Sequence, residues 1–99
     1  MNFIIEFDPK AEKEYFDAWD WYEEQLIGLG DRFGNSVIRQ IEFISKAPLS
    51  YPSKKAQSRE CKIEDFPFLI IYKIYPAKNV IYISSIFHTS RNPRKKYPK

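Results

Sequence analysis

Three side chains in the C-terminal half of the chain could carry out chemistry on a phosphodiester: His88, Arg59 and Arg91. Metal-free cleavage of RNA needs a base for the 2′-hydroxyl proton, cations that stabilise the pentavalent phosphate, and an acid for the leaving oxygen. An imidazole with an ordinary pKa of about 6.5 suits either proton role, and guanidinium groups suit the phosphate. We therefore treat these three residues as catalytic candidates on the condition that the protein is a nuclease.

Charge is distributed unevenly along the chain. Residues 1–50 carry ten acidic and five basic side chains, whereas residues 51–99 carry three acidic and eleven basic ones. A half this basic can attract a polyanion or an acidic protein segment. The residues that we assign to binding a target or a nucleic acid are Lys54, Lys55, Arg94, Lys95 and Lys96. A solvated surface is the alternative, but residues 89–99 contain five bases and no acid, which favours an acidic ligand.

Length and composition limit the class of protein. The 99 residues are 43% hydrophobic and 17% aromatic, so we expect a single domain over residues 1–99 with a basic tail from about residue 89. The chain has one cysteine, Cys61, and one histidine, which excludes an internal disulfide and a Cys/His zinc site. No membrane span, signal peptide or glycine-rich phosphate loop is apparent. These features predict a cytoplasmic protein without a metal or a cofactor.

Hydrophobic periodicity predicts the element order β-α-α-β-β-β. We expect a strand over residues 2–7 and two amphipathic helices over about 9–27 and 31–46. The link between the helices is short enough to make them antiparallel neighbours. After a polar loop over 48–57, an antiparallel meander is expected at 59–63, 68–75 and 80–88. The fold class is therefore α+β, an antiparallel sheet packed on an antiparallel helical hairpin, and the edge of the meander that the first strand joins is left open.

The predicted sheet is apolar on both faces, and two helices can cover only one of them. We therefore expect a partner protein to bind the second face. Trp21 lies off the apolar stripe of the first helix, beside acidic residues such as Glu14, and is a further contact candidate. The complete set of predicted partner contacts is Leu69, Ile71, Tyr75, Tyr82, Ile86 and Trp21.

Strand parity separates two of the catalytic candidates. His88 has the parity of Tyr82 and Ile86 and should lie at the end of the open face, whereas Arg59 has the parity of Cys61 on the core side. Unless a bulge intervenes, Arg59 and His88 then point to opposite faces of the sheet. The alternatives to catalysis are an Arg59 that pairs with a helix carboxylate and a His88 that is hydrogen-bonded to the backbone.

Several segments, in their order and spacing, resemble the RelE/ParE toxin superfamily, whose members are often labelled plasmid stabilisation proteins. They are residues 19–25 (Trp-Asp-Trp-Tyr-Glu-Glu-Gln), residues 28–33 (Gly-Leu-Gly-Asp-Arg-Phe), Arg59, residues 66–72 (Phe-Pro-Phe-Leu-Ile-Ile-Tyr) and residues 87–93 (Phe-His-Thr-Ser-Arg-Asn-Pro). Together they extend over nearly the whole chain, and they are more similar to the ParE-like branch.

The resemblance implies the toxin component of a bacterial toxin-antitoxin system, which inhibits growth and forms a hetero-oligomer with a cognate antitoxin protein. RelE-like members cut messenger RNA on the ribosome without a metal ion, and ParE-like members inhibit DNA gyrase. Fold alone does not choose between these targets.

The residues before the meander weigh against RNA cleavage. Residues 43–58 contain no Asp or Glu, so the chain lacks the carboxylate base that some RNA-cutting relatives place there. We therefore favour a toxin that inhibits gyrase by binding. Cleavage of messenger RNA by His88 with Arg59 or Arg91 is the alternative, and an inactive relative kept as an interaction module is the third reading.

Overall fold

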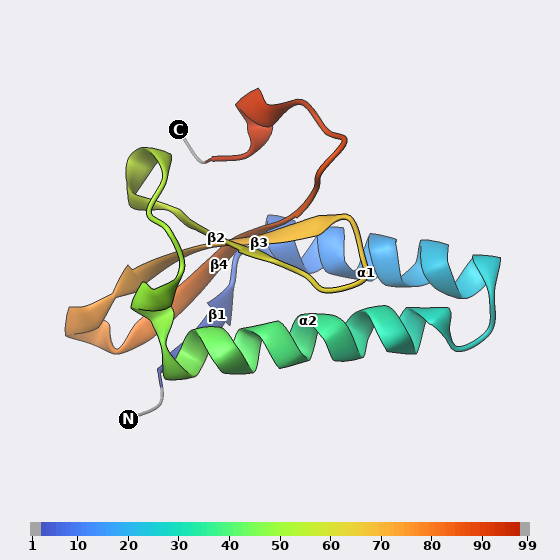
Figure 1. The fold of residues 1–99 in the computed structure, drawn as a ribbon, viewed down its shortest axis with the longest axis horizontal. Coiled ribbons are helices and arrows are strands. Elements are labelled where there is room, and N and C mark those ends of the chain that lie inside the picture. Colours follow the sequence, from blue (N-terminus) through green and yellow to red (C-terminus); the bar gives the residue numbers. More distant parts are fainter. Residues whose placement is uncertain (1–2, 98–99) are drawn as a thin grey trace.

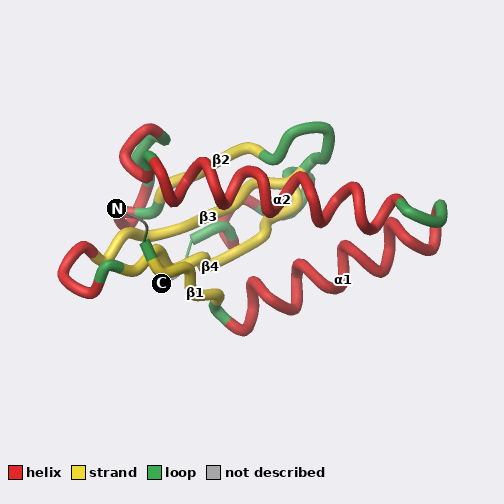
Figure 2. Tube along the Cα trace, turned by 90° about the horizontal axis from the view of Figure 1, so that it is seen from below, coloured by secondary structure: helices red, strands yellow, loops and turns green. Residues whose placement is uncertain are grey.

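The computed structural model describes residues 3–97 and contains six main elements (Figure 1). They are β1 (Ile4–Phe7), α1 (Pro9–Gln25), α2 (Leu29–Lys46), β2 (Arg59–Lys62), β3 (Phe68–Tyr75) and β4 (Val80–His88). The helical hairpin lies against one face of the sheet (Figure 2). The predicted α+β class and element order are confirmed, while the expected strand start at residue 2 and the end of the basic tail lie outside the described residues.

The four strands form one sheet in the order β1-β4-β3-β2. β2, β3 and β4 are the predicted antiparallel meander. β1 joins the β4 edge and runs parallel to it, with Ile4 opposite Val80 and Phe7 opposite Ile83, so the sheet is mixed. Because β1 reaches only residues 80–83 of β4, the second half of β4 is an edge, and this edge faces α1.

Carboxylate side chains stabilise the start of α1 and the link between the two helices. The carboxylate of Asp8 accepts a hydrogen bond from the Lys10 amide at 2.8 Å, which caps α1. Between the helices, Gly28 has a φ of +91°, a conformation that glycine adopts without strain. The carboxylate of Glu23 accepts from the amides of Gly28 and Gly30, at 3.0 Å each, and so satisfies free donors at the start of α2.

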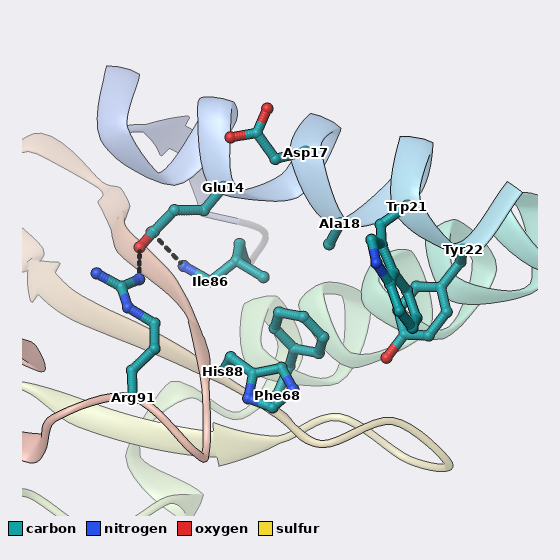
Figure 3. Close-up of a pocket in the computed structure, with 9 residues that line it drawn as sticks. All are labelled: Glu14, Asp17, Ala18, Trp21, Tyr22, Phe68, Ile86, His88 and Arg91. Carbon is teal, nitrogen blue, oxygen red and sulfur yellow. Dashed lines mark hydrogen bonds and ion pairs between the residues drawn. The ribbon is translucent and has the colours of Figure 1, made fainter. Parts of the chain in front are cut away.

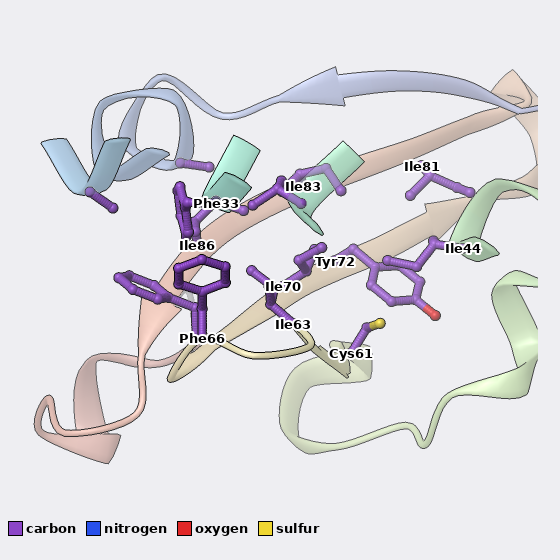
Figure 4. Packing of buried hydrophobic residues seen from close by; sticks show 14 residues of the cluster. Phe33, Ile44, Cys61, Ile63, Phe66, Ile70, Tyr72, Ile81, Ile83 and Ile86 are labelled. Atoms are coloured by element: carbon purple, nitrogen blue, oxygen red, sulfur yellow. The ribbon is translucent and has the colours of Figure 1, made fainter. Parts of the chain in front are cut away.

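The hydrophobic core lies between the hairpin and the facing side of the sheet (Figure 4). Its centre is aromatic: the ring of Phe33 on α2 lies 5.7 Å from that of Tyr15, 5.3 Å from that of Tyr22 and 5.2 Å from that of Phe68. Isoleucines from β3 and β4 fill the rest. The residues less than 2% exposed in this cluster are Ala11, Phe33, Val37, Ile44, Cys61, Ile63, Ile70, Tyr72, Ile81, Ile83 and Ile86.

A β-bulge interrupts β4 near its middle. On one side of it Tyr72 of β3 pairs with Ile83, and on the other side Ile71 pairs with Ser85, so Ser84 is an extra residue without a partner in β3. One extra residue shifts the alternation of side chains by one position for the remainder of the strand. The two halves of β4 therefore present opposite parities to the helices.

The bulge corrects two predictions. Ile86, expected on the open face, is 1% exposed and belongs to the core beneath the helices. His88 lies on the same helix side, opposite Phe68 of β3, and not at the end of the open face. Phe87 takes the opposite face instead. Both predictions were wrong because strict alternation along residues 80–88 ignored the extra residue.

The far face of the sheet is covered by the tail that follows β4 (Figure 1). Lys96 lies 3.2 Å from the carboxylate of Glu60 on β2, and the hydroxyl of Tyr97 donates to the same carboxylate. Beneath this tail Ile71 is 0% and Phe87 is 1% exposed. The expectation that this whole face lies open is therefore wrong, because the chain's own tail covers Ile71 and Phe87, while Tyr75 on the same face stays 44% exposed. Over residues 3–97, neither helix is both long and apolar enough to span a bilayer.

Candidate functional site

A cavity of about 390 Å³ opens between α1 and the edge half of β4 (Figure 3). We name it the α1–β4 pocket. One wall is formed by side chains from successive turns of α1, and the other by β3, the end of β4 and the first residues of the tail. Its lining residues are Glu14, Asp17, Ala18, Trp21, Tyr22, Phe68, Ile86, His88 and Arg91.

Glu14 is the centre of the polar contacts in this pocket. One of its oxygens accepts from the Ser85 hydroxyl at 2.8 Å and from the Ile86 amide at 3.1 Å. The other oxygen pairs with the guanidinium of Arg91. The Glu14 side chain is only 14% exposed. Within residues 3–97, no strand pairs with this part of β4 on the edge away from β3. The helix carboxylate therefore satisfies an amide of that edge and also holds the tail to α1.

Sequence reasoning missed this role of Glu14, which it grouped with the solvated acids of the helix. Residues at i and i+4 share a helix face, and Glu14 precedes Ala18, one of the two buried residues of α1, by four. That spacing is the available signal. It shows that an acid adjoins the buried stripe, although it does not reveal which partner the carboxylate meets.

The ring of His88 is engaged on one side. Its Nδ1 accepts from the Ser90 amide at 3.0 Å and lies 2.7 Å from the Ser90 hydroxyl. A ring nitrogen that accepts an amide proton keeps its lone pair, so the neutral ring carries its proton on Nε2. The ring also packs edge-on against Phe68, with centroids 4.9 Å apart. His88 is thus a strand-end residue bonded to the backbone, as the alternative to catalysis expected, and only Nε2 is left for a ligand.

Arg91 lies in the same pocket as His88, but its charge is already paired with Glu14. Its guanidinium carbon also lies 5.0 Å from the centroid of the Phe87 ring, on the other side of the strand edge. The structure therefore brings two of the three catalytic candidates together. Arg91, the cation in the same pocket as His88, is thus paired with the Glu14 carboxylate.

Arg59 belongs to another part of the molecule. Its guanidinium donates to the backbone carbonyl of Tyr51 at 2.6 Å, so its partner is a carbonyl and not the helix carboxylate of the alternative to catalysis. Arg59 pairs with Tyr72 of β3, whereas His88 pairs with Phe68, four residues away. At about 3.4 Å per residue, this is a separation of roughly 14 Å along the strand alone. The two residues share the helix side of the sheet yet cannot act on one phosphate.

The predicted basic residues are not part of the α1–β4 pocket. Lys54 and Lys55 lie in the loop before β2, and Arg94 and Lys95 in the tail, all exposed. Lys96 differs from them because it is half-buried and paired with Glu60.

The predicted partner contacts fall into exposed and covered groups. Trp21 is 57% and Tyr75 is 44% exposed, so both can reach another protein. Leu69 and Tyr82 are half-buried, and Ile71 lies under the tail. Ile86 is excluded by its place in the core.

An apolar groove that sequence reasoning missed lies between β1 and the helical hairpin. Its cavity of about 370 Å³ is lined by Ile5, Phe7, Tyr15, Phe16, Val37, Ile38 and Ile41, with Glu12 and Glu42 at its rim. Phe16 is 55% and Ile38 52% exposed. Large apolar residues off the core stripe of each helix were the signal for this surface.

The same fold occurs in solved bacterial toxins. The structure of a chromosomal ParDE toxin-antitoxin system from P. aeruginosa aligns with a TM-score of 0.76 at 15% identity, covering 89% of this chain and 97% of that one. The intact RelBE toxin-antitoxin complex of E. coli aligns with 0.68 at 16% identity, covering 90% and 99%. The isolated E. coli RelE toxin also aligns with 0.68, at 14% identity, covering 95% and 92%. A search of curated protein sequences gave no match.

The architecture is therefore that of a RelE/ParE-type toxin. The sequence is more specific: residues 5–93 match the family model described as the ParE toxin of the type II toxin-antitoxin system, parDE. The chain belongs to the ParE toxin family, and it is the toxin of a type II toxin-antitoxin system.

Proposed function

We propose that this toxin acts by binding rather than by cutting, that its target is DNA gyrase, and that a cognate antitoxin neutralises it in the cytoplasm. The observation that carries the choice of target is the match to the ParE family over residues 5–93. The geometry is compatible with it, because Arg59 lies apart from His88 and the charge of Arg91 is taken up by Glu14. A surface that acts by binding does not need these groups to converge.

The target is tested directly with purified gyrase and a relaxed plasmid. We expect the purified toxin to block supercoiling in a dose-dependent manner, and the purified antitoxin to restore it. Supercoiling that is unchanged at a saturating dose of folded toxin would exclude gyrase.

Cleavage of messenger RNA remains the second candidate, because His88 and Arg91 line the same pocket. Primer extension on translated messages after induction decides it. If the toxin cuts RNA, new 5′ ends appear, and His88→Ala lowers cleavage by about 100-fold or more, as expected for loss of a general acid or base. Lys78→Ala, an exposed lysine outside the pocket, is the matched control. An absence of new 5′ ends excludes the candidate.

We also propose that the antitoxin contacts Trp21 and Tyr75, the two predicted contact residues with large exposed areas. The ParDE and RelBE relatives were solved as toxin-antitoxin systems, and a short acidic protein encoded beside this chain is the expected partner. Trp21→Ala should weaken the complex by about 30-fold, since buried tryptophans often dominate interfaces. Phe43→Ala, equally exposed on α2 at 52%, is the control, and equal effects of both variants would contradict a specific role for Trp21.

Normal growth on induction without antitoxin would favour an inactive interaction module.

A further inference from the structure

A third cavity, of about 250 Å³, shares no residue with the α1–β4 pocket or with the apolar groove. It is enclosed by the start of α1, by β3 and β4 before the bulge, and by the tail. We name it the lysine pocket. Its lining residues are Asp8, Lys10, Lys73, Tyr75, Tyr82, Ser84 and Lys96.

Three lysines from three separate elements converge on this cavity. Lys73 is the one charged residue of β3, whose sequence is otherwise Phe, Leu, Ile and Tyr, and its side chain is half-buried. Within residues 3–97 neither Lys10 nor Lys73 takes part in an ion pair, whereas Lys96 is paired with Glu60. The Lys73 ammonium has no acidic partner in the described chain, so its charge is available to an anionic ligand. Lys73 is therefore a residue whose position a ligand would explain.

The one acidic residue in the lining offsets only one of the three lysine charges. The Asp8 carboxylate accepts from the Lys10 amide at 2.8 Å and from the Tyr82 hydroxyl at 2.5 Å, so both of its oxygens are used within the protein. Glu6 lies opposite Tyr82 on β1 but does not line the cavity. The lining therefore keeps an excess of positive charge, and the donors left for a ligand are chiefly the lysine ammonium groups.

We propose that the lysine pocket binds the phosphate group of a nucleotide unit, either free or within a single-stranded nucleic acid, with the base against the exposed ring of Tyr75. Ammonium groups are point charges that suit a tetrahedral phosphate approached from several directions, whereas a planar carboxylate is matched best by an arginine fork. Tyr75 is 44% exposed and its ring lies 6.4 Å from that of Tyr82. An aromatic face beside cations is the usual arrangement for binding single strands. The proposal does not depend on gyrase as the target.

The experiment measures binding to the purified chain of four probes: inorganic phosphate, adenosine monophosphate, a fluorescent single-stranded octanucleotide and a poly-glutamate peptide. We expect Lys73→Gln to weaken nucleotide and octanucleotide binding by about 10-fold or more. For the octanucleotide, the slope of log affinity against log salt should fall by about one. Tyr75→Leu should weaken the octanucleotide but not inorganic phosphate, since stacking needs a base. Lys78→Gln, at an exposed lysine in the turn Pro76–Lys78 outside the lining, should change affinity by less than twofold.

The four probes also separate the sources of the phosphate. Tighter binding of the octanucleotide than of the mononucleotide identifies a strand as the ligand, and equal affinity per site identifies a free nucleotide. The proposal is overturned if Lys73→Gln and Lys78→Gln bind alike, or if only poly-glutamate binds in a Lys73-dependent manner. Should Lys73→Gln fail to fold, Lys10→Gln on the exposed start of α1 tests the same pocket. Gyrase is absent from the assay, so its outcome is independent of the proposed target.

Discussion

Glu14 supplies, from a helix, the hydrogen-bond acceptor that a neighbouring strand would otherwise provide to the edge of β4. It accepts from the amide of Ile86 and from Ser85, and it pairs with Arg91. Removal of this side chain leaves a buried amide without an acceptor, which costs about 1–3 kcal/mol, in addition to the lost ion pair.

We therefore expect Glu14→Ala to lower the free energy of unfolding by about 2–4 kcal/mol, measured by urea denaturation. Glu14→Gln keeps an oxygen for the amide and loses the charge, so its effect should be smaller. Glu24→Gln, an exposed acid on the same helix, is the matched control for charge. A Glu14→Ala protein as stable as the Glu24→Gln protein would contradict this account.

The contact between Tyr82 and Asp8 predicts a pH effect. The hydrogen bond from Tyr82 lowers the pKa of Asp8 below its ordinary value of 3.8 and raises the pKa of Tyr82 to about 12. Since the folded pKa of Asp8 is depressed, its contribution to stability is present above pH 4 or so and is lost as the pH falls through the folded value.

Tyr82→Phe should therefore raise the pKa of Asp8 and weaken the loss of stability in acid. An NMR titration of the Asp8 carboxyl and thermal melts between about pH 2 and 6 measure both effects. An unchanged Asp8 pKa in this variant would show that the hydroxyl does not stabilise the carboxylate.

At the scale of elements, the bulge of β4 decides what the sheet presents to each side. Before Ser84 the core side carries Ile81 and Ile83, and after it the core side carries Ile86 and His88. Deletion of Ser84 would remove this extra residue and restore regular pairing with β3, and it would leave Ile86 and His88 on the core side, because Ile83 and Ile86 would then be two positions apart.

We expect the Ser84 deletion to fold cooperatively with Ile86 still in the core and to shift the melting temperature by less than about 8 °C, because it removes only the residue that has no partner in β3. Ser84→Ala keeps the residue count and loses only one hydrogen bond, from the hydroxyl to the Ile71 carbonyl at 3.2 Å. It should cost about 1 kcal/mol. Melting curves of the two variants compare loss of the extra residue with loss of its hydroxyl, and loss of cooperative melting in the deletion variant would contradict this account of the bulge.

Periodicity predicted the elements well for physical reasons. The helices have long apolar stripes, and the strands are rich in isoleucine and aromatic residues, so the order and approximate bounds of all six could be predicted. The bulge could not, because it depends on pairing with β3 and leaves no pattern within β4 itself. His88 and Ile86 were misplaced for that reason alone. The lysine pocket was missed although Lys73 is the one charged residue of β3, because the other lysines of the pocket come from α1 and the tail.

For the whole molecule, the tail is the component that covers the apolar middle of the second face of the sheet. Ile71 and Phe87 are almost fully buried, and neither α1 nor α2 lies on their side of the sheet (Figure 1). Lys96 and Tyr97 attach the tail to β2 through their contacts with Glu60. Arg91 attaches it to α1 through its ion pair with Glu14.

Truncation after Ser90 should therefore expose the far face while leaving the core under the helices intact. We expect the shortened chain to bind a hydrophobic dye such as ANS, to aggregate at lower concentration and to lose several kcal/mol of stability, since each buried Ile or Phe contributes about 1.5–3 kcal/mol. Glu60→Gln in the untruncated chain is the control. It weakens the contact of Lys96 with β2 but leaves the tail in place, so dye binding should rise only slightly. If the truncated chain binds no more dye than the complete one, the far face is shielded by something other than the tail, and the tail has no part in closing the fold.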